Sequence, residues 1–211
     1  RGILKTGAWK PSDIQCTGAR DGTAESLSRD TGIGHTFDYH ELISQSNWII
    51  LACKPQQLTD LPGDLASSGA GRRVLSILAG PPLERLKALL PGASNIVRAM
   101  PNTPGMIGAG ITAYASLEPL DPDDENDVGR MLSALGEVLP VEESLLNAVT
   151  GLSGSGPAYV FEFVAALRDG GIAAGLDPGT AYRLALKTVR GAAELLEQVP
   201  ETPETHRDWV S

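Results

Sequence analysis

Three continuous, largely apolar runs constrain the fold of this 211-residue chain more than any other feature. They read Trp-Ile-Ile-Leu-Ala-Cys at 48–53, Val-Leu-Ser-Ile-Leu-Ala at 74–79 and Asn-Ile-Val-Arg-Ala-Met at 95–100. Runs of this length are typical of strands buried on both faces, as in a parallel sheet. A segment with helical spacing, 83–90, lies between the second run and the third. Strands that alternate with helices predict an α/β fold with a doubly wound, mostly parallel, Rossmann-like sheet.

The pattern changes near Glu143. One more strand is predicted at 111–115, and after residue 143 the strand signal gives way to long segments rich in Ala and Leu. Asp121 and Asp177 are each followed by Pro, which predicts the N-cap and first residue of a helix at both places. We therefore expect a sheet domain over 1–143, followed by an all-helical domain over 144–211.

Composition excludes several classes of function. The net charge of −9 and the aromatic content of 5% argue against a nucleic-acid partner. No apolar run approaches the roughly 20 residues that a membrane-spanning helix needs. Cys16 and Cys53 are isolated and the three histidines are scattered, so no metal site is expected. Sparse cysteines and the absence of a visible signal peptide favour the cytoplasm.

The ends of the three buried runs are candidate ligand contacts, because open α/β sheets bind ligands at the carboxyl ends of their strands. Lys54 and Pro55 follow the first run, and Ala79 ends the second. A solvated lysine and ordinary turn chemistry explain these two places at least as well. Asn102 follows the third run between two prolines, and it is either a donor and acceptor for an amide or part of a plain turn.

Three further places carry weaker signals. Arg20 follows a short strand predicted at 14–17, and an arginine there accommodates a 2′-phosphate, which favours NADP if the fold binds a dinucleotide. The Gly/Ser-rich segment 151–157 could hold an anion at a helix start. It lacks the Lys-Ser/Thr ending of a P-loop, so we favour a kink that lets helices pack. Glu142 and Glu143 form either an anchor for a cationic nitrogen or an exposed acidic turn.

Four motifs in order resemble the pyrroline-5-carboxylate reductases over essentially the whole chain. They are Ala-Cys-Lys-Pro-Gln at 52–56, Ala-Gly at 79–80, Arg-Ala-Met-Pro-Asn-Thr-Pro at 98–104 and Ala-Val-Thr-Gly-Leu-Ser-Gly-Ser-Gly-Pro-Ala-Tyr at 148–159. Each motif alone is weak, whereas the ordered set is highly specific.

The resemblance implies NAD(P)H-dependent reduction of the C=N bond of 1-pyrroline-5-carboxylate to L-proline, the last step of proline biosynthesis. It also implies a homodimer or larger homo-oligomer formed through the helical domain, and a substrate contact at Glu143. NADP is the expected cofactor, with NAD as the other possibility. Together with the arguments from strand ends, the expected cofactor contacts are Thr17, Arg20, Ala52, Lys54, Pro55, Ala79 and Asn102.

The chain departs from the family pattern in four places. The family's Gly-rich pyrophosphate loop would lie before Arg1, and its Pro-Gly-Gly-x-Thr segment would lie after Ser211. No catalytic residue is therefore assigned within the chain, which we interpret as an internal fragment. Tyr39 stands where the family usually has Asn in the adenosine pocket, and Trp209 stands where a polar residue is common.

Two other functions stay open. A β-hydroxyacid-type dehydrogenase would place a catalytic lysine on the helical domain. Lys187 is the only lysine after Lys87, and it lacks the surrounding motif of such enzymes. A non-catalytic dinucleotide-binding scaffold would bind the cofactor without turnover.

We predict that residues 1–211, produced alone, do not reduce pyrroline-5-carboxylate, because the glycine loop and the family threonine lie outside them. The measurement is consumption of NADPH in the presence of the substrate. Turnover above the rate without substrate would contradict the prediction.

Overall fold

The computed structural model describes residues 1–61 and 69–210. Contacts divide the chain into two compact units, Arg1–Ser155 and Gly156–Ser211. The domain boundary expected after Glu143 stays a prediction. By their contacts, residues 144–155 belong to the first unit. Among the described residues, no helix is both long and apolar enough to cross a membrane.

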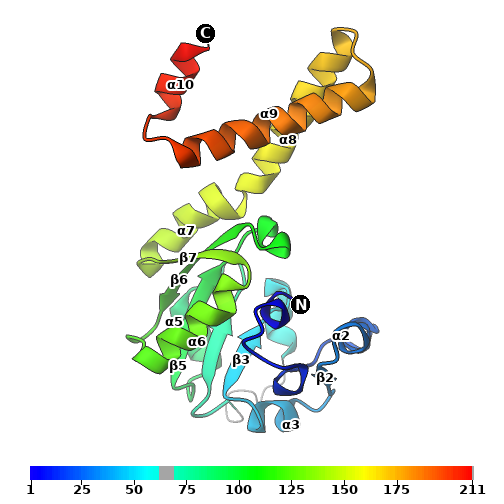
Figure 1. Cartoon of the computed structure of the whole chain (residues 1–211). Helices are drawn as coiled ribbons and strands as arrows, with labels where there is room; N and C mark the ends of the chain where they lie inside the picture. Colours follow the sequence, from blue (N-terminus) through cyan, green and yellow to red (C-terminus); the bar gives the residue numbers. More distant parts are fainter. Residues whose placement is uncertain (62–68, 211) are drawn as a thin grey trace. The chain divides into compact units, whose positions relative to one another are not determined.

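The first unit contains the predicted sheet, with the strand order β3-β4-β5-β6-β7 (Figure 1). Pairing is parallel from β3 to β5, antiparallel between β5 and β6, and parallel again between β6 and β7. A separate parallel pair, β1 with β2, precedes it. The bounds are β1 (Gln15–Cys16), β2 (Gly34–His35), β3 (Trp48–Leu51), β4 (Arg73–Ser76), β5 (Asn95–Met100), β6 (Gly110–Ser116) and β7 (Gly136–Pro140). The mostly parallel α/β sheet expected from the sequence is confirmed.

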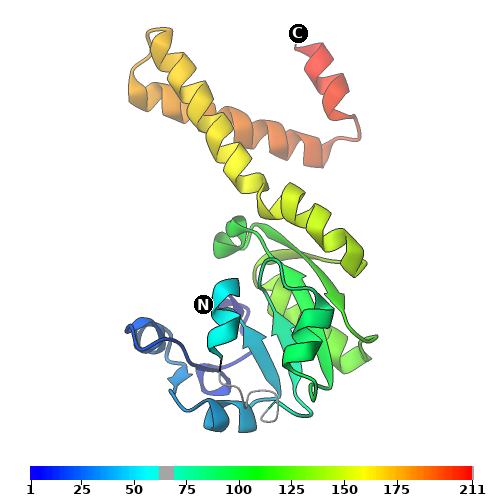
Figure 2. The same ribbon diagram turned by 180° about the vertical axis from the view of Figure 1, so that it is seen from behind.

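Helices cover both faces of the five-stranded sheet (Figures 1 and 2). Side chains from α3, α5 and α7 pack with one set of strand residues, and side chains from α1 and α6 pack with the other set. Among the described residues, the α-helices of this unit are α1 (Gly2–Lys5), α2 (Thr23–Thr31), α3 (Tyr39–Ser44), α5 (Leu83–Leu89), α6 (Pro122–Ser133) and α7 (Leu146–Val149). The shorter turns are the 3-10 helices η1 (Pro11–Asp13), η2 (Pro55–Asp60), η3 (Thr103–Ile107) and η4 (Glu143–Leu145), and the π-helix η5 (Thr150–Gly154).

The central strand β5 shows how the sheet divides its side chains. Ile96 belongs to the core on the α5 face and Val97 to the core on the α6 face, as the two-residue period of a strand requires. The first five residues of β5 are buried, so this strand matches the sequence expectation in both length and burial.

One expectation about burial is wrong. The run at 48–53 was expected to be covered on both faces, but the strand ends at Leu51 and Ile50 is 42% exposed. The reason is position, because β3 is an edge strand of the five-stranded sheet. The α6 core that covers β4 and β5 includes Trp48 of β3, and it leaves Ile50 exposed.

The second unit is helical. It consists of α8 (Gly156–Ala173), α9 (Pro178–Gln198) and the unpredicted α10 (Pro203–Trp209). Asp177 caps α9 as predicted, and hydrogen bonds led by that from Thr180 lower the pKa of its carboxyl. Gly171 lets α8 approach α9 closely, since a Cβ there would lie 3.2 Å from the Cβ of Ala181.

The α8–α9 pair buries few side chains of its own. Val164, Ala181 and Ala185 are its buried apolar residues. Many larger apolar side chains are exposed within the described unit: Tyr159, Val160, Phe161, Phe163, Leu167, Ile172, Leu176, Tyr182, Leu184, Leu186, Leu195 and Leu196. An exposed apolar surface of this extent is typical of a protein–protein interface.

Candidate functional site

The parallel register brings three turns to one edge of the sheet. Leu51 pairs with Ser76, and Ser76 pairs with Arg98, so β3, β4 and β5 point the same way. The Ile77 N–H donates to the carbonyl oxygen of Leu51 at 3.1 Å, which joins the two strand ends directly. The turns that follow these strands therefore start side by side at the carboxyl edge, where open α/β sheets bind ligands.

The turn after β3 holds three of the predicted cofactor contacts. Ala52 and Lys54 are exposed, and Pro55 begins the 3-10 helix η2. The Lys54 backbone is extended, and its N–H donates to Oε1 of Gln57 at 2.9 Å. The backbone at Lys54 is thus fixed while its ammonium group stays accessible to an anion.

The turn after β4 presents bare backbone. Ala79 and Gly80 are exposed, and Gly80 has a φ of +107°, which glycine adopts at little cost. Apart from Gly80 itself and its two chain neighbours, no described atom lies within 4 Å of the point where a Gly80 Cβ would be. A flat ligand can approach the main chain here, and α5 starts three residues later at Leu83.

The turn after β5 is tied to its surroundings by Asn102. Its Oδ1 accepts from the Ile111 N–H at 3.1 Å, and its Nδ2 lies 3.5 Å from Oγ of Ser153. Gly154 packs on the same strand end, since a Cβ there would lie 2.4 Å from Cε of Met100. The segment for which we favoured a helix kink is thus a π-helix at this edge, a form often found at functional sites.

Thr17 and Arg20 follow β1, in the separate two-stranded sheet. Oγ1 of Thr17 is buried and has no hydrogen-bond partner among the described residues. The Arg20 guanidinium lies over the Phe37 ring, 4.6 Å from its centroid, while Arg20 itself stays exposed. An orphaned hydroxyl and a stacked cation at one strand end fit an anionic group. Tyr39 is half-buried and packs on the core of the α5 face.

Glu143 is engaged inside the first unit. Its Oε1 accepts from the Leu83 N–H at 2.6 Å and pairs with Nη1 of Arg98 at 3.2 Å. These contacts do not test the expected substrate contact. They do show two partners that the sequence analysis missed. A charged residue in the middle of a buried run, as Arg98 is, was the signal that could have revealed them.

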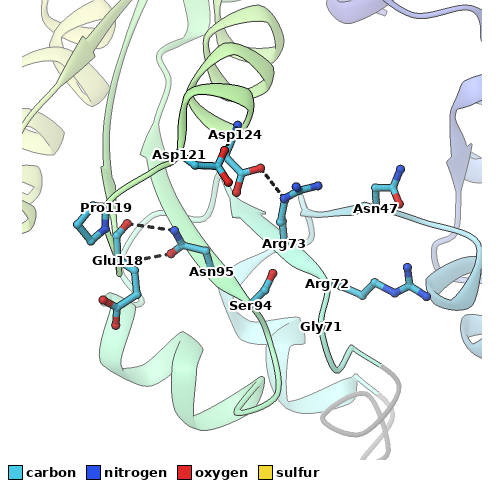
Figure 3. A pocket seen from close by; sticks show the side chains of 10 residues that line it. All are labelled: Asn47, Gly71, Arg72, Arg73, Ser94, Asn95, Glu118, Pro119, Asp121 and Asp124. Atoms are coloured by element: carbon cyan, nitrogen blue, oxygen red, sulfur yellow. Dashed lines mark hydrogen bonds and ion pairs between the residues drawn. The ribbon is translucent and has the colours of Figure 1, made fainter.

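A separate cavity of about 440 Å³ lies at the opposite end of the strands (Figure 3). Several of its polar groups pair with one another. Arg73 forms an ion pair with Asp124 at 2.5 Å, and Asn95 exchanges hydrogen bonds with the backbone of Glu118. Arg73 and Asn95 are the first residues of β4 and β5, so the cavity is remote from the carboxyl-edge turns. No group of three or more His, Cys, Asp or Glu side chains in the described residues could hold a metal.

Comparison with known proteins decides the family. Residues 143–211 match the family model described as pyrroline-5-carboxylate reductase dimerisation, and residues 1–80 match that of the NADP oxidoreductase, coenzyme F420-dependent. A pyrroline-5-carboxylate reductase from Methanosarcina acetivorans is 32% identical, with all of this chain aligned to 78% of that protein. The chain belongs to the pyrroline-5-carboxylate reductase family.

Other members of this oxidoreductase family give the same result. The Synechocystis reductase is 44% identical over 82% of this chain, and the chain spans 65% of that protein's length. The solved reductase from Coxiella burnetii is 30% identical, with a TM-score of 0.87 over 100% of this chain and 80% of that one. A Plasmodium falciparum reductase solved with NADP bound has the same fold at 24% identity, with a TM-score of 0.87. The expected sheet and helical dimerisation region are those of the reductase fold.

We predict that Gly110→Ala disorders the Asn102 turn and destabilises the protein by about 2 kcal/mol, because an alanine Cβ would overlap its neighbours. That Cβ would lie 2.6 Å from the Gly105 nitrogen and 2.7 Å from Oδ1 of Asn102. Denaturant unfolding measures the loss. Gly151→Ala is the matched control, since its Cβ would meet no described atom within 4 Å beyond its own stretch of helix backbone and its chain neighbours. Equal stability of the two variants would show that the Gly110 contact is unimportant.

Proposed function

We propose that the protein carrying this chain reduces the C=N bond of 1-pyrroline-5-carboxylate to L-proline, the last step of proline biosynthesis. The observation that carries the proposal is the match to named reductases along the whole chain, in sequence and in fold. The same match favours this function over a β-hydroxyacid-type dehydrogenase or a non-catalytic scaffold.

The cofactor of the proposed reaction is NADPH, held by residues at the strand ends. Lys54, with Ala52 and Pro55, provides a cation and exposed backbone after β3, and Ala79 provides open backbone after β4. Asn102 offers Nδ2 to an amide, since its Oδ1 is already used by Ile111. After β1, Thr17 offers a hydroxyl that has no partner among the described residues, and Arg20 offers a stacked guanidinium. These groups fit an anionic dinucleotide, and the support from related proteins is for NADP rather than NAD.

The chemistry of the proposed step is balanced by one hydride and one proton. NADPH, when bound, would supply the hydride to the imine carbon, and the ring nitrogen would gain the proton to become the secondary amine of proline. The contribution of this chain is to bind and orient. Its turns hold the cofactor at the sheet edge, and Asn102 fixes the third turn against β6 and the π-helix.

We also propose a homodimer formed through the helical unit, in the cytoplasm. The support is the family model for dimerisation over residues 143–211 and the apolar side chains that α8 and α9 leave exposed. The partners of the enzyme are then a second copy of itself and a small substrate, without nucleic acid or membrane.

The test of the function is an assay of the protein that carries this chain, with NADPH and 1-pyrroline-5-carboxylate. We expect NADPH consumption and proline formation in equal amounts, and no turnover with a β-hydroxyacid and NADP. Cofactor binding without turnover of the imine would support the scaffold instead. Oxidation of the β-hydroxyacid would support the other dehydrogenase.

We predict that Arg20→Ala weakens NADPH binding about tenfold and leaves NADH binding unchanged, because a charge-assisted contact to the 2′-phosphate is lost. Fluorescence titration of both cofactors measures the two dissociation constants. Arg29→Ala is the matched control, since Arg29 is an exposed arginine in the last turn of α2. An equal loss for both cofactors would place Arg20 away from the 2′-phosphate.

A further inference from the structure

A buried arginine lies in the middle of the sheet. Arg98 is 5% exposed on β5, on the same face as Ile96, among the apolar side chains that α5 covers. A guanidinium does not lose its proton in a protein, and a buried charge is costly unless it is paired. The buried guanidinium of Arg98 therefore needs charged or polar partners inside the protein.

Its partners are Glu143 and Asn147. Nη1 of Arg98 lies 3.2 Å from Oε1 of Glu143, and Nη2 lies 3.4 Å from Oδ1 of Asn147. The pair joins the centre of the sheet to η4 and α7, the segment that leads into the π-helix. Glu142, the adjacent acid, is exposed and takes part in neither contact.

The same carboxylate oxygen also caps the N-terminus of α5. The Leu83 N–H donates to Oε1 of Glu143 at 2.6 Å, across 60 residues of sequence. The N-cap of α5 is Pro82, which has no side-chain acceptor, so the first N–H of the helix needs one from elsewhere. A carboxylate suits this place because the N-terminus of a helix carries partial positive charge.

The hydrogen bond between Leu83 and Glu143 matters because Leu83 lies at the end of a turn that is proposed to contact the cofactor. Leu83 comes directly after the turn 77–82, whose exposed Ala79 and Gly80 are proposed to meet the cofactor. Ser76, at the other end of that turn, pairs in register with Arg98. Arg98 thus lies beside the residue where the turn begins, and Glu143 holds the residue where it ends.

We propose that Arg98 and Glu143 are positioning residues that fix the turn 77–82 for the cofactor. Glu143 acts on cofactor binding through Leu83 and this turn. The catalytic consequence rests on the proposed function, whereas the fixing of the turn does not.

The first experiment needs no activity. Amide hydrogen exchange is measured at Leu83 in the unmodified protein, in Glu143→Ala and in the control Glu142→Ala. We expect exchange at Leu83 to become about fivefold faster in Glu143→Ala, the effect of losing a helix cap, and to stay unchanged in the control. Unchanged exchange in Glu143→Ala would overturn the proposal.

The second experiment separates cofactor from substrate. In Glu143→Ala we expect the Kd of NADPH to rise about fivefold, whether or not the KM of pyrroline-5-carboxylate at saturating NADPH also changes. Glu143→Gln, whose amide oxygen still accepts from Leu83, should recover most of the affinity for NADPH. A raised KM for the substrate with an unchanged Kd for NADPH would overturn the proposal in favour of a direct substrate contact.

Two provisions keep the outcomes distinct. If Glu143→Ala does not fold, Glu143→Asp shortens the side chain by one methylene and keeps the charge, and the same two measurements decide. If the unmodified protein binds no NADPH, the proposed function fails, and the exchange rate at Leu83 still decides whether Glu143 fixes the turn.

Discussion

Parallel pairing of β3, β4 and β5 is the constraint on which the rest of the first unit depends. Parallel neighbours cannot be joined by a tight hairpin, so β3 and β4 must each be followed by a crossover that returns the chain to the opposite edge of the sheet. The ends of all three strands consequently lie together, and their turns form one surface. Helices α5 and α6 cover opposite faces of the sheet, which buries the central strand and leaves the turns accessible.

The three turns are held in place by different contacts, one between near neighbours in sequence and two between residues farther apart. The turn after β3 is fixed by a local hydrogen bond from Lys54 to Gln57. The turn after β5 is fixed across the sheet edge by Asn102. The turn after β4 has small residues at its tip, and the Leu83 N–H that follows it donates to Glu143, which is far away in sequence. The exposed tip of this turn, Ala79 and Gly80, can accept a flat ligand, while the buried Leu78 and the contact of Leu83 with Glu143 hold its two sides.

The helical unit has the opposite balance of surface and core. Two long helices bury little more than Val164, Ala181 and Ala185 against one another, and leave aromatic and aliphatic side chains exposed. Burial of apolar area is the main stabilising contribution in folding, so a pair of helices with so small a core gains stability from further contacts. A second copy of the same unit, as the family's dimerisation region implies, would supply them.

The features that the sequence by itself determined depend on residues close together along the chain. Runs of apolar residues located β3, β4 and β5, Asp121 and Asp177 located two helix starts, and the ordered motifs identified the family. Short elements such as β2 and α3 were not predicted, because two to six residues carry too little periodicity. The exposure of Ile50 and the network of Arg98, Glu143 and Leu83 were decided only by the tertiary structure. Both depend on strand order and register, which bring together residues that are distant in sequence. A local sequence pattern does not specify which distant residues become neighbours.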